Sequence, residues 1–77
     1  MTDDAILELI RTHGAKRCSD AAYLSMQGRP ASAQALGLGG LTLPGLHRVA
    51  VLAYRLMPAE DQATDLAEAV IAASKLP

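Results

Sequence analysis

Cysteine and histidine are the residues of this 77-residue chain best suited to chemistry, because a thiol can act as a nucleophile and an imidazole as a base or metal ligand. The chain holds one cysteine, Cys18, and two histidines, His13 and His47. A zinc site takes three or four ligands at recurring spacings, and these residues show no such pattern. We therefore expect a buried structural cysteine, solvated or helix-capping histidines, no catalytic residue, no metal or other cofactor, and no enzymatic activity.

Charge is distributed unevenly along the chain, although the formal net charge is only −1. Segment 11–55 holds six basic residues and a single acid, Asp20, whereas segments 1–10 and 56–77 are acidic. Two interpretations are open: the acidic ends neutralise the basic middle across a compact fold, or the basic residues form a face for an anionic partner. The candidate residues for binding a partner or an anion are Arg48, Arg55, Tyr54, His47, Lys16, Arg17 and Arg29.

Arg48 and Arg55 are the strongest of these candidates, because a spacing of seven places them on one side of a helix, next to His47 and Tyr54. A tyrosine beside arginines can stack on a nucleobase or pair with acidic side chains. A helix-turn-helix alignment around Gly28 fits poorly, and the chain lacks the overall positive charge typical of DNA-binding proteins. A protein is therefore the preferred partner, and nucleic acid or a small nucleotide is the alternative.

The stretch from Ala35 to Gly45 alternates glycines with leucines. It lacks the Gly-Lys-Ser/Thr of a phosphate-binding loop, and a helical pattern precedes it where a dinucleotide fingerprint needs a strand. Leucines are costly to expose on a solvated loop, and those of the stretch are Leu36, Leu38, Leu41 and Leu43. We expect segment 37–45 to be a buried connector that turns at its glycines, with the amides around 42–46 as an alternative anion site.

Helices must position the candidate binding residues, because apolar residues recur along the chain at three- and four-residue spacings. No segment shows the alternation of apolar and polar residues that is typical of a strand. The pattern predicts an all-α fold in a single helical domain, 1–77, built as a compact bundle of four to five short helices. Their expected ranges are about 2–13, 19–27, 30–36, 44–57 and 58–75.

Start and stop signals set the first two ranges. Thr2 can cap the first helix and Gly14 suits its C-terminal end. Ser19 or Asp20 can cap the second helix, and Gly28 closes it.

Prolines and a threonine set the remaining ranges. Pro30 suits the first position of the third helix, and Thr42 or Pro44 can open the fourth. Pro58 ends the fourth helix and can begin the fifth.

Each expected helix carries an apolar stripe that we expect to face the core. The stripe of the first helix is Ile6, Leu7, Leu9 and Ile10, and that of the second is Ala22, Leu24 and Met26. The stripe of the fourth is Leu46, Val49, Ala50, Ala53, Leu56 and Met57. The stripe of the fifth is Ala63, Leu66, Ala67, Val70, Ile71 and Ser74.

The composition predicts a light core, because alanine and leucine dominate and there is no Phe or Trp. A single cysteine indicates a reducing compartment, and the absence of a signal-peptide pattern or a long apolar run favours a cytoplasmic protein without a membrane span. Small residues outside the last stripe, Ala69, Ala72 and Ala73, would let a second copy pack closely. We expect a non-catalytic interaction module, an adaptor, regulator or inhibitor, that binds a protein and forms a homodimer.

Overall fold

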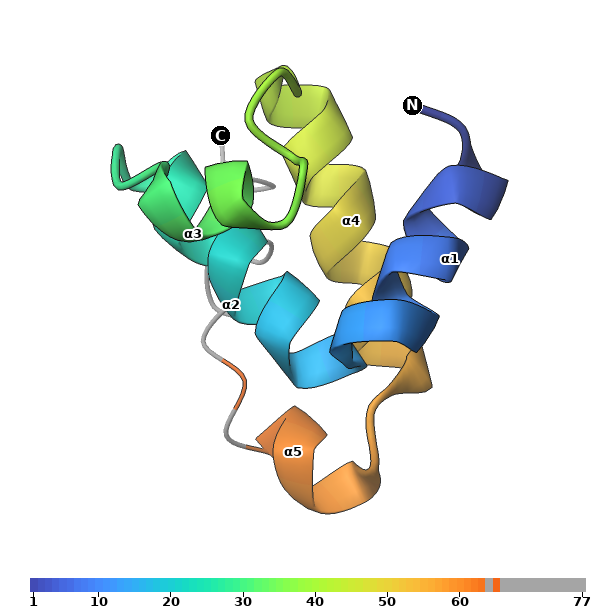
Figure 1. Cartoon of the computed structure of the whole chain (residues 1–77). Helices are drawn as coiled ribbons and strands as arrows, with labels where there is room; N and C mark the ends of the chain where they lie inside the picture. The colour runs from blue at the N-terminus through green and yellow to red at the C-terminus, as the bar shows by residue number, and fades with distance from the viewer. Residues whose placement is uncertain (64, 66–77) are drawn as a thin grey trace.

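The described part of the chain, residues 1–63 and 65 of a computed structural model, is helical and contains no strand (Figure 1). Its helices are α1 (Asp3–His13), α2 (Ala15–Met26), α3 (Ala31–Ala35), α4 (Leu43–Leu56) and α5 (Ala59–Ala63). The predicted all-α fold is confirmed.

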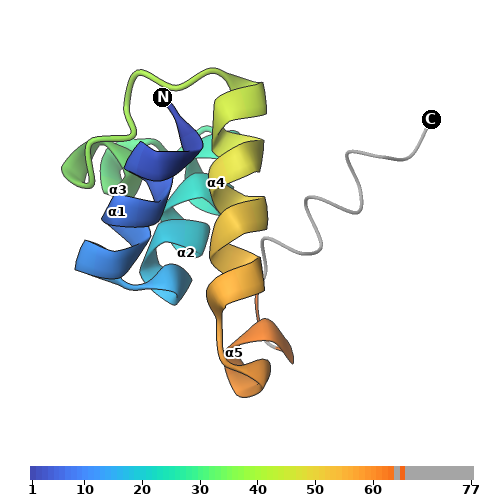
Figure 2. The same cartoon turned by 90° about the vertical axis from the view of Figure 1, so that its right-hand side faces the viewer.

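Three helices, α1, α2 and α4, form the centre of the fold (Figure 1). α1 and α4 run in the same direction, and α2 runs in the opposite sense and packs against both (Figures 1 and 2). α3 packs on the far end of α2, and α5 lies at the other end of the molecule, below the end of α4 (Figure 1). The glycine-rich connector after α3 crosses the top of the molecule to reach α4 (Figures 1 and 2).

The core is built where α2 crosses α4, and small side chains dominate it. Ala21 and Ala22 of α2 and Ala50 and Ala53 of α4 are fully or almost fully buried. Alanines let two helix backbones approach closely, although each contributes little buried apolar area. The largest fully buried side chains come from several elements and are Ile6, Leu38, Val49, Cys18 and Ser19.

The second helix begins earlier than the predicted residue 19, because a single residue joins it to α1. Gly14 has a φ of +94°, which side chains of L residues rarely adopt. Its amide donates to the Ile10 carbonyl at 2.7 Å, and its carbonyl accepts from the Cys18 amide at 3.1 Å. Gly14 therefore ends one helix and opens the next, and Ser19, expected as a cap, lies buried inside α2.

Other helix ends match the predicted signals more closely. Thr2 caps α1 by accepting from the Ala5 amide at 3.2 Å, and Thr42 caps α4 by accepting from the Gly45 amide at 3.4 Å. Pro30 is the N-cap of α3 rather than its first residue, so that helix is shorter than predicted.

The predicted last helix, 58–75, is observed over Ala59–Ala63, and Asp65 is not helical. Ala63, expected to face inward, is exposed. The rest of the predicted range lies outside the described residues, including the alanines at 69, 72 and 73 on which the expected dimer depended.

The connector is buried in part, as expected. Leu36 and Leu38 are buried and Leu41 is half-buried, whereas Leu43 is 63% exposed at the first turn of α4. Gly37, with a φ of +82°, supplies the turn that lets the chain leave α3 while its leucines point inward.

Two leucines that the periodic pattern assigned to the core lie at the surface instead. Leu7 of α1 is 39% exposed and Leu56 of α4 is 56% exposed. On α1 the core takes Ile6 and Ile10, four residues apart, and Leu7 projects about 100° away from Ile6. At the end of α4 the core takes Ala53 and Met57, which leaves Leu56 outside it.

Candidate functional site

The predicted binding residues do not form one basic face. Arg48, Arg55, His47 and Tyr54 lie on α4, and the remaining three are Lys16 and Arg17 in the first turn of α2 and Arg29 beyond its other end. All four arginines are exposed, whereas the other three side chains are half-buried. The fold brings Arg48 and Arg55 to one side of α4, as their spacing predicts.

Arg48 forms an ion pair with Asp3, at the start of α1. Its Nε lies 3.1 Å from Oδ1 of Asp3 and its Nη2 lies 2.6 Å from Oδ2, so the guanidinium binds both carboxylate oxygens. The hydrogen bond from Arg48 holds the pKa of Asp3 below its ordinary value, and the Asp3 carboxylate raises the pKa of Arg48. The pair ties the first turn of α1 to the middle of α4.

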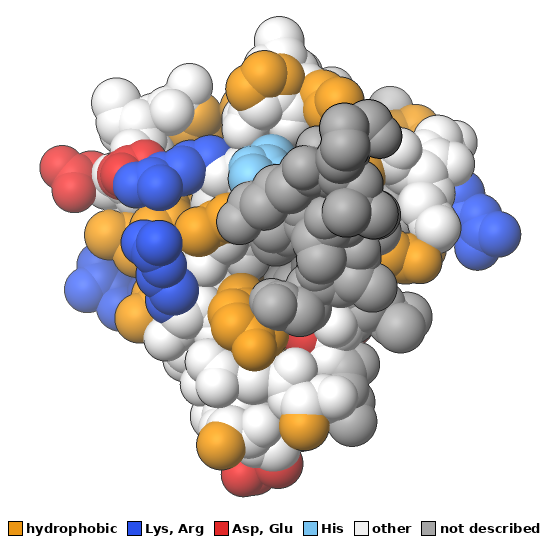
Figure 3. All heavy atoms as spheres, turned by 180° about the vertical axis from the view of Figure 1, so that it is seen from behind, with side chains coloured by type: hydrophobic (Ala, Val, Ile, Leu, Met, Phe, Trp, Pro, Cys, Tyr) orange, Lys and Arg blue, Asp and Glu red, His pale blue; other side chains and the backbone are white. Residues whose placement is uncertain are grey.

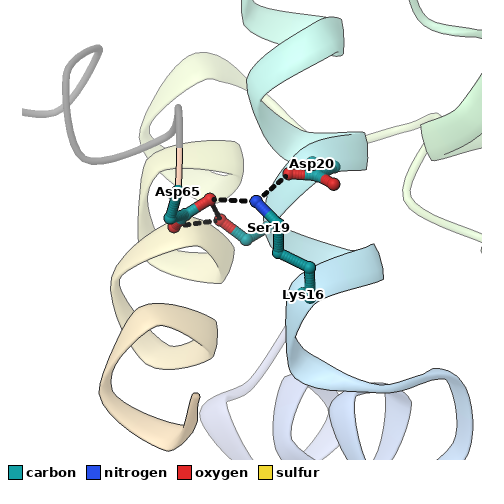
Figure 4. A network of polar contacts seen from close by, with 4 residues as sticks. All are labelled: Lys16, Ser19, Asp20 and Asp65. Atoms are coloured by element: carbon teal, nitrogen blue, oxygen red, sulfur yellow. Dashed lines mark hydrogen bonds and ion pairs between the residues drawn. The ribbon is translucent and has the colours of Figure 1, made fainter. Parts of the chain in front are cut away.

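Lys16 belongs to a second network, which connects α2 with Asp65, two positions beyond the end of α5 (Figure 4). The Lys16 Nζ lies 3.0 Å from Oδ1 of Asp20 and 3.4 Å from Oδ1 of Asp65. The Ser19 hydroxyl donates to the buried Asp65 carboxylate, whose oxygens lie at 2.8 and 3.0 Å. Although partial burial favours the neutral amine, the two carboxylates hold the pKa of Lys16 above its ordinary value.

These pairs support the interpretation that the acidic ends neutralise the basic middle. Asp3 belongs to acidic segment 1–10 and Asp65 to acidic segment 56–77, and each pairs with a basic residue of segment 11–55. Arg11 also pairs with Glu8, its neighbour on α1. Within the described residues, the basic side chains that form no ion pair are Arg17, Arg29 and Arg55.

An open groove of about 670 Å³ runs beside α2. His13, Lys16 and Arg17 line it together with the carboxylates of Asp20 and Asp61. Its walls carry both acids and bases, so the groove offers no concentrated positive field for an anionic ligand.

A smaller groove of about 370 Å³, here called the α1–α4 groove, runs along α1 beside the end of α4. It is lined by Asp4, Leu7, Glu8, Ile10, Arg11 and Leu56. Leu7 and Leu56, the two leucines excluded from the core, therefore meet in one depression. Figure 3, which shows the molecule from behind, has hydrophobic side chains between basic ones at the edge formed by α1 and α4.

The charges of the α1–α4 groove are ordered along its length. Asp4 lies in the first turn of α1, whereas Arg11 lies in its last turn. Arg55 lies in the last turn of α4, just before the groove residue Leu56, on the same side of that helix as Arg48. The groove thus carries Asp4 at one end and the Glu8–Arg11 pair toward the other, with Leu7 between them and the exposed Arg55 just beyond the second end.

Periodicity alone did not single out Leu7 and Leu56, because both are apolar and fit the stripes. The sequence signal was a pair of consecutive apolar residues at 6–7 and another at 56–57. Consecutive residues of a helix point in different directions, so one side of the helix cannot bury both equally. Arg55 was among the predicted binding residues, whereas Asp4 was not.

The remaining candidate chemical groups occupy structural positions. Cys18 is fully buried, its thiol lies 3.6 Å from the Leu9 carbonyl oxygen, and burial raises its pKa, which disfavours the reactive thiolate. The Nε2 atom of His47 is buried and has no hydrogen-bond partner among the described residues. No group of three or more His, Cys, Asp or Glu residues that could hold a metal ion occurs in residues 1–63 and 65.

Comparisons with known proteins give no relative from which a function can be transferred: no family model, curated protein or solved structure matches the chain. Among the described helices, none combines the length and apolar character needed to cross a membrane. The case for a function therefore depends on the surface of the molecule itself.

Proposed function

We propose that the protein is a non-catalytic interaction module that binds a protein partner through the α1–α4 groove. The observation that carries this proposal is the meeting of Leu7 and Leu56, which come from different helices and are both exposed in one depression. Exposed apolar patches bordered by charged residues are typical of protein–protein contact surfaces. A partner that covers the two leucines would remove apolar area that the fold itself leaves in water.

A binder of anionic ligands is the weaker alternative. Arg48 and Lys16, two of the residues on which that function depended, are paired with carboxylates of the same chain. An anionic ligand would have to displace those carboxylates before it gained a contact of its own. The open groove beside α2 offers little compensation, because its charges are mixed.

The proposal includes a regulatory or inhibitory role in a cytoplasmic setting. A chain of 8.0 kDa can act by covering part of a larger protein, as adaptors and inhibitors do. A reducing compartment suits the sole cysteine, which is buried and has no second thiol to pair with.

Affinity capture from a native lysate tests the proposal with a matched pair of variants. Leu56→Asp places a charge inside the groove, whereas Leu43→Asp makes the same change at an exposed leucine outside the lining of this groove. Proteins captured specifically by the wild-type chain should be lost with Leu56→Asp and retained with Leu43→Asp, as quantified by mass spectrometry. Equal capture by both variants would exclude the groove as the contact surface.

A further inference from the structure

We propose that a second copy of this chain occupies the α1–α4 groove, with the two copies related by a two-fold axis that crosses the groove. This inference rests on the proposed function of the groove and names its partner. It follows from the order of charges along the groove and from the position of the leucines between them.

The first argument is the charge order. Asp4 lines the acidic end of the groove, and Arg55 lies just beyond its other end, next to the lining residue Leu56. Neither forms an ion pair within the described residues. A two-fold axis perpendicular to α1 reverses the order in the second copy, so that each Asp4 faces the Arg55 of the other chain. A partner of uniform charge would instead meet a like charge at one end of the groove.

The second argument is the spacing along α1. Asp4 and Arg11 are seven residues apart, about 10 Å along the helix axis, and Leu7 lies close to the midpoint. An axis near Leu7 therefore brings the apolar middles of the two grooves together and turns the Asp4 end of one copy toward the end of the other copy where the last turns of α1 and α4 place Arg11 and Arg55. The same patch serves both copies, as an isologous interface requires.

The third argument is that the neighbouring acidic residues are already paired within one chain. Asp3 is held by Arg48 and Glu8 by Arg11, so these acids are already matched inside one chain. Asp4 and Arg55 are the charges at the two ends of this surface for which the described part of the chain supplies no opposite charge. A second copy supplies an opposite charge to Asp4 and to Arg55 at the same time.

Sedimentation equilibrium of the purified full chain over micromolar concentrations tests the proposal. The wild-type chain should dimerise, and either Asp4→Lys or Arg55→Glu should raise the dimer dissociation constant by about tenfold or more, because each variant faces like charges across the axis. An equimolar mixture of the two variants should recover wild-type affinity as a heterodimer, since Lys at position 4 then meets Glu at position 55. Arg29→Glu, a charge reversal outside the groove, should leave dimerisation unchanged.

The mixture separates lost pairing from lost folding, because two variants that were merely unfolded would not rescue each other. A wild-type chain that stays monomeric throughout, single variants that dimerise as well as wild type, or a mixture that fails to recover would each overturn the two-fold arrangement. A monomeric chain whose lysate partner is still lost with Leu56→Asp would overturn the self-pairing alone and leave the proposed function standing. A dimer that captures no other protein would keep the self-pairing and confine the function to self-association.

Discussion

At the residue scale, the Ser19 and Asp65 pair is the most unusual feature of the molecule. A buried carboxylate is costly unless hydrogen bonds and opposite charge compensate it, and here Ser19 and Lys16 both contribute. The three residues join the beginning of α2 to the chain that follows α5 (Figure 4). The network therefore links two parts of the chain that are 46 residues apart in the sequence.

Removing the Ser19 hydroxyl should destabilise the fold. Ser19→Ala deletes the hydroxyl that donates to the buried Asp65 carboxylate, and the expected loss is about 1–3 kcal/mol in the free energy of unfolding. Urea denaturation followed by circular dichroism measures this loss. Ser32→Ala, at an exposed serine of α3, is the control and should stay within about 0.5 kcal/mol of wild type. A Ser19→Ala chain as stable as that control would show that the hydrogen bond contributes nothing.

At the scale of the elements, the joint between α1 and α2 decides how the first half of the chain folds. Gly14 alone connects the two helices, and its positive φ turns the chain sharply enough for α2 to run back along α1. Any longer connection would shift Cys18 and Ser19, which are fully buried a few residues later. The backbone freedom of one residue thus places the polar network and part of the core.

Gly14→Ala should destabilise the protein by about 1–3 kcal/mol, because alanine is strained at this φ even though no atom obstructs its Cβ. Gly40→Ala is the matched control, since Gly40 has open space around it and does not have a positive φ. That variant should be neutral or stabilising by up to about 1 kcal/mol, through the unfolded chain. Thermal unfolding of both variants measures the difference, and equal midpoints would contradict the assigned role of Gly14.

At the scale of the whole molecule, small side chains hold the bundle together by letting α2 and α4 approach closely. Ala22, Ala50 and Ala53 are fully buried. Because protein interiors are close-packed, a larger side chain at these positions would have to displace its neighbours. Each contact in such a core contributes little hydrophobic free energy. The apolar residues that remain outside the core are therefore energetically important. Leu7 and Leu56 are larger than the alanines that fill the core, yet the fold leaves both at the surface.

Ala53→Leu should push α4 away from α2 and cost about 1–3 kcal/mol through overpacking. Ala31→Leu adds the same side chain at an exposed position of α3 and should change stability by about 0.5 kcal/mol or less. The midpoints of urea denaturation compare the two variants. Tolerance of leucine at position 53 would mean that the packing between these helices is loose.

Local signals in the sequence determined the helical class and several helix ends. Thr2, Thr42, Gly14 and Gly37 act within a few residues of their own position, so their roles follow from short-range hydrogen bonds and backbone freedom. The start of α2 was missed because Ser19 is as suitable a cap by type as it is a buried hydrogen-bond donor. Its actual role depends on Asp65, far along the chain.

Tertiary structure alone decided which side chains meet. Periodicity can assign Leu7 and Leu56 to apolar stripes, but the finite width of the contact between helices decides that Ile6 and Met57 enter the core instead. Likewise, an uneven charge sequence permits either a basic face or internal pairing, and only the juxtaposition of α1 with α4 matches Arg48 to Asp3. Distances between residues remote in sequence are set by packing, which no local pattern encodes.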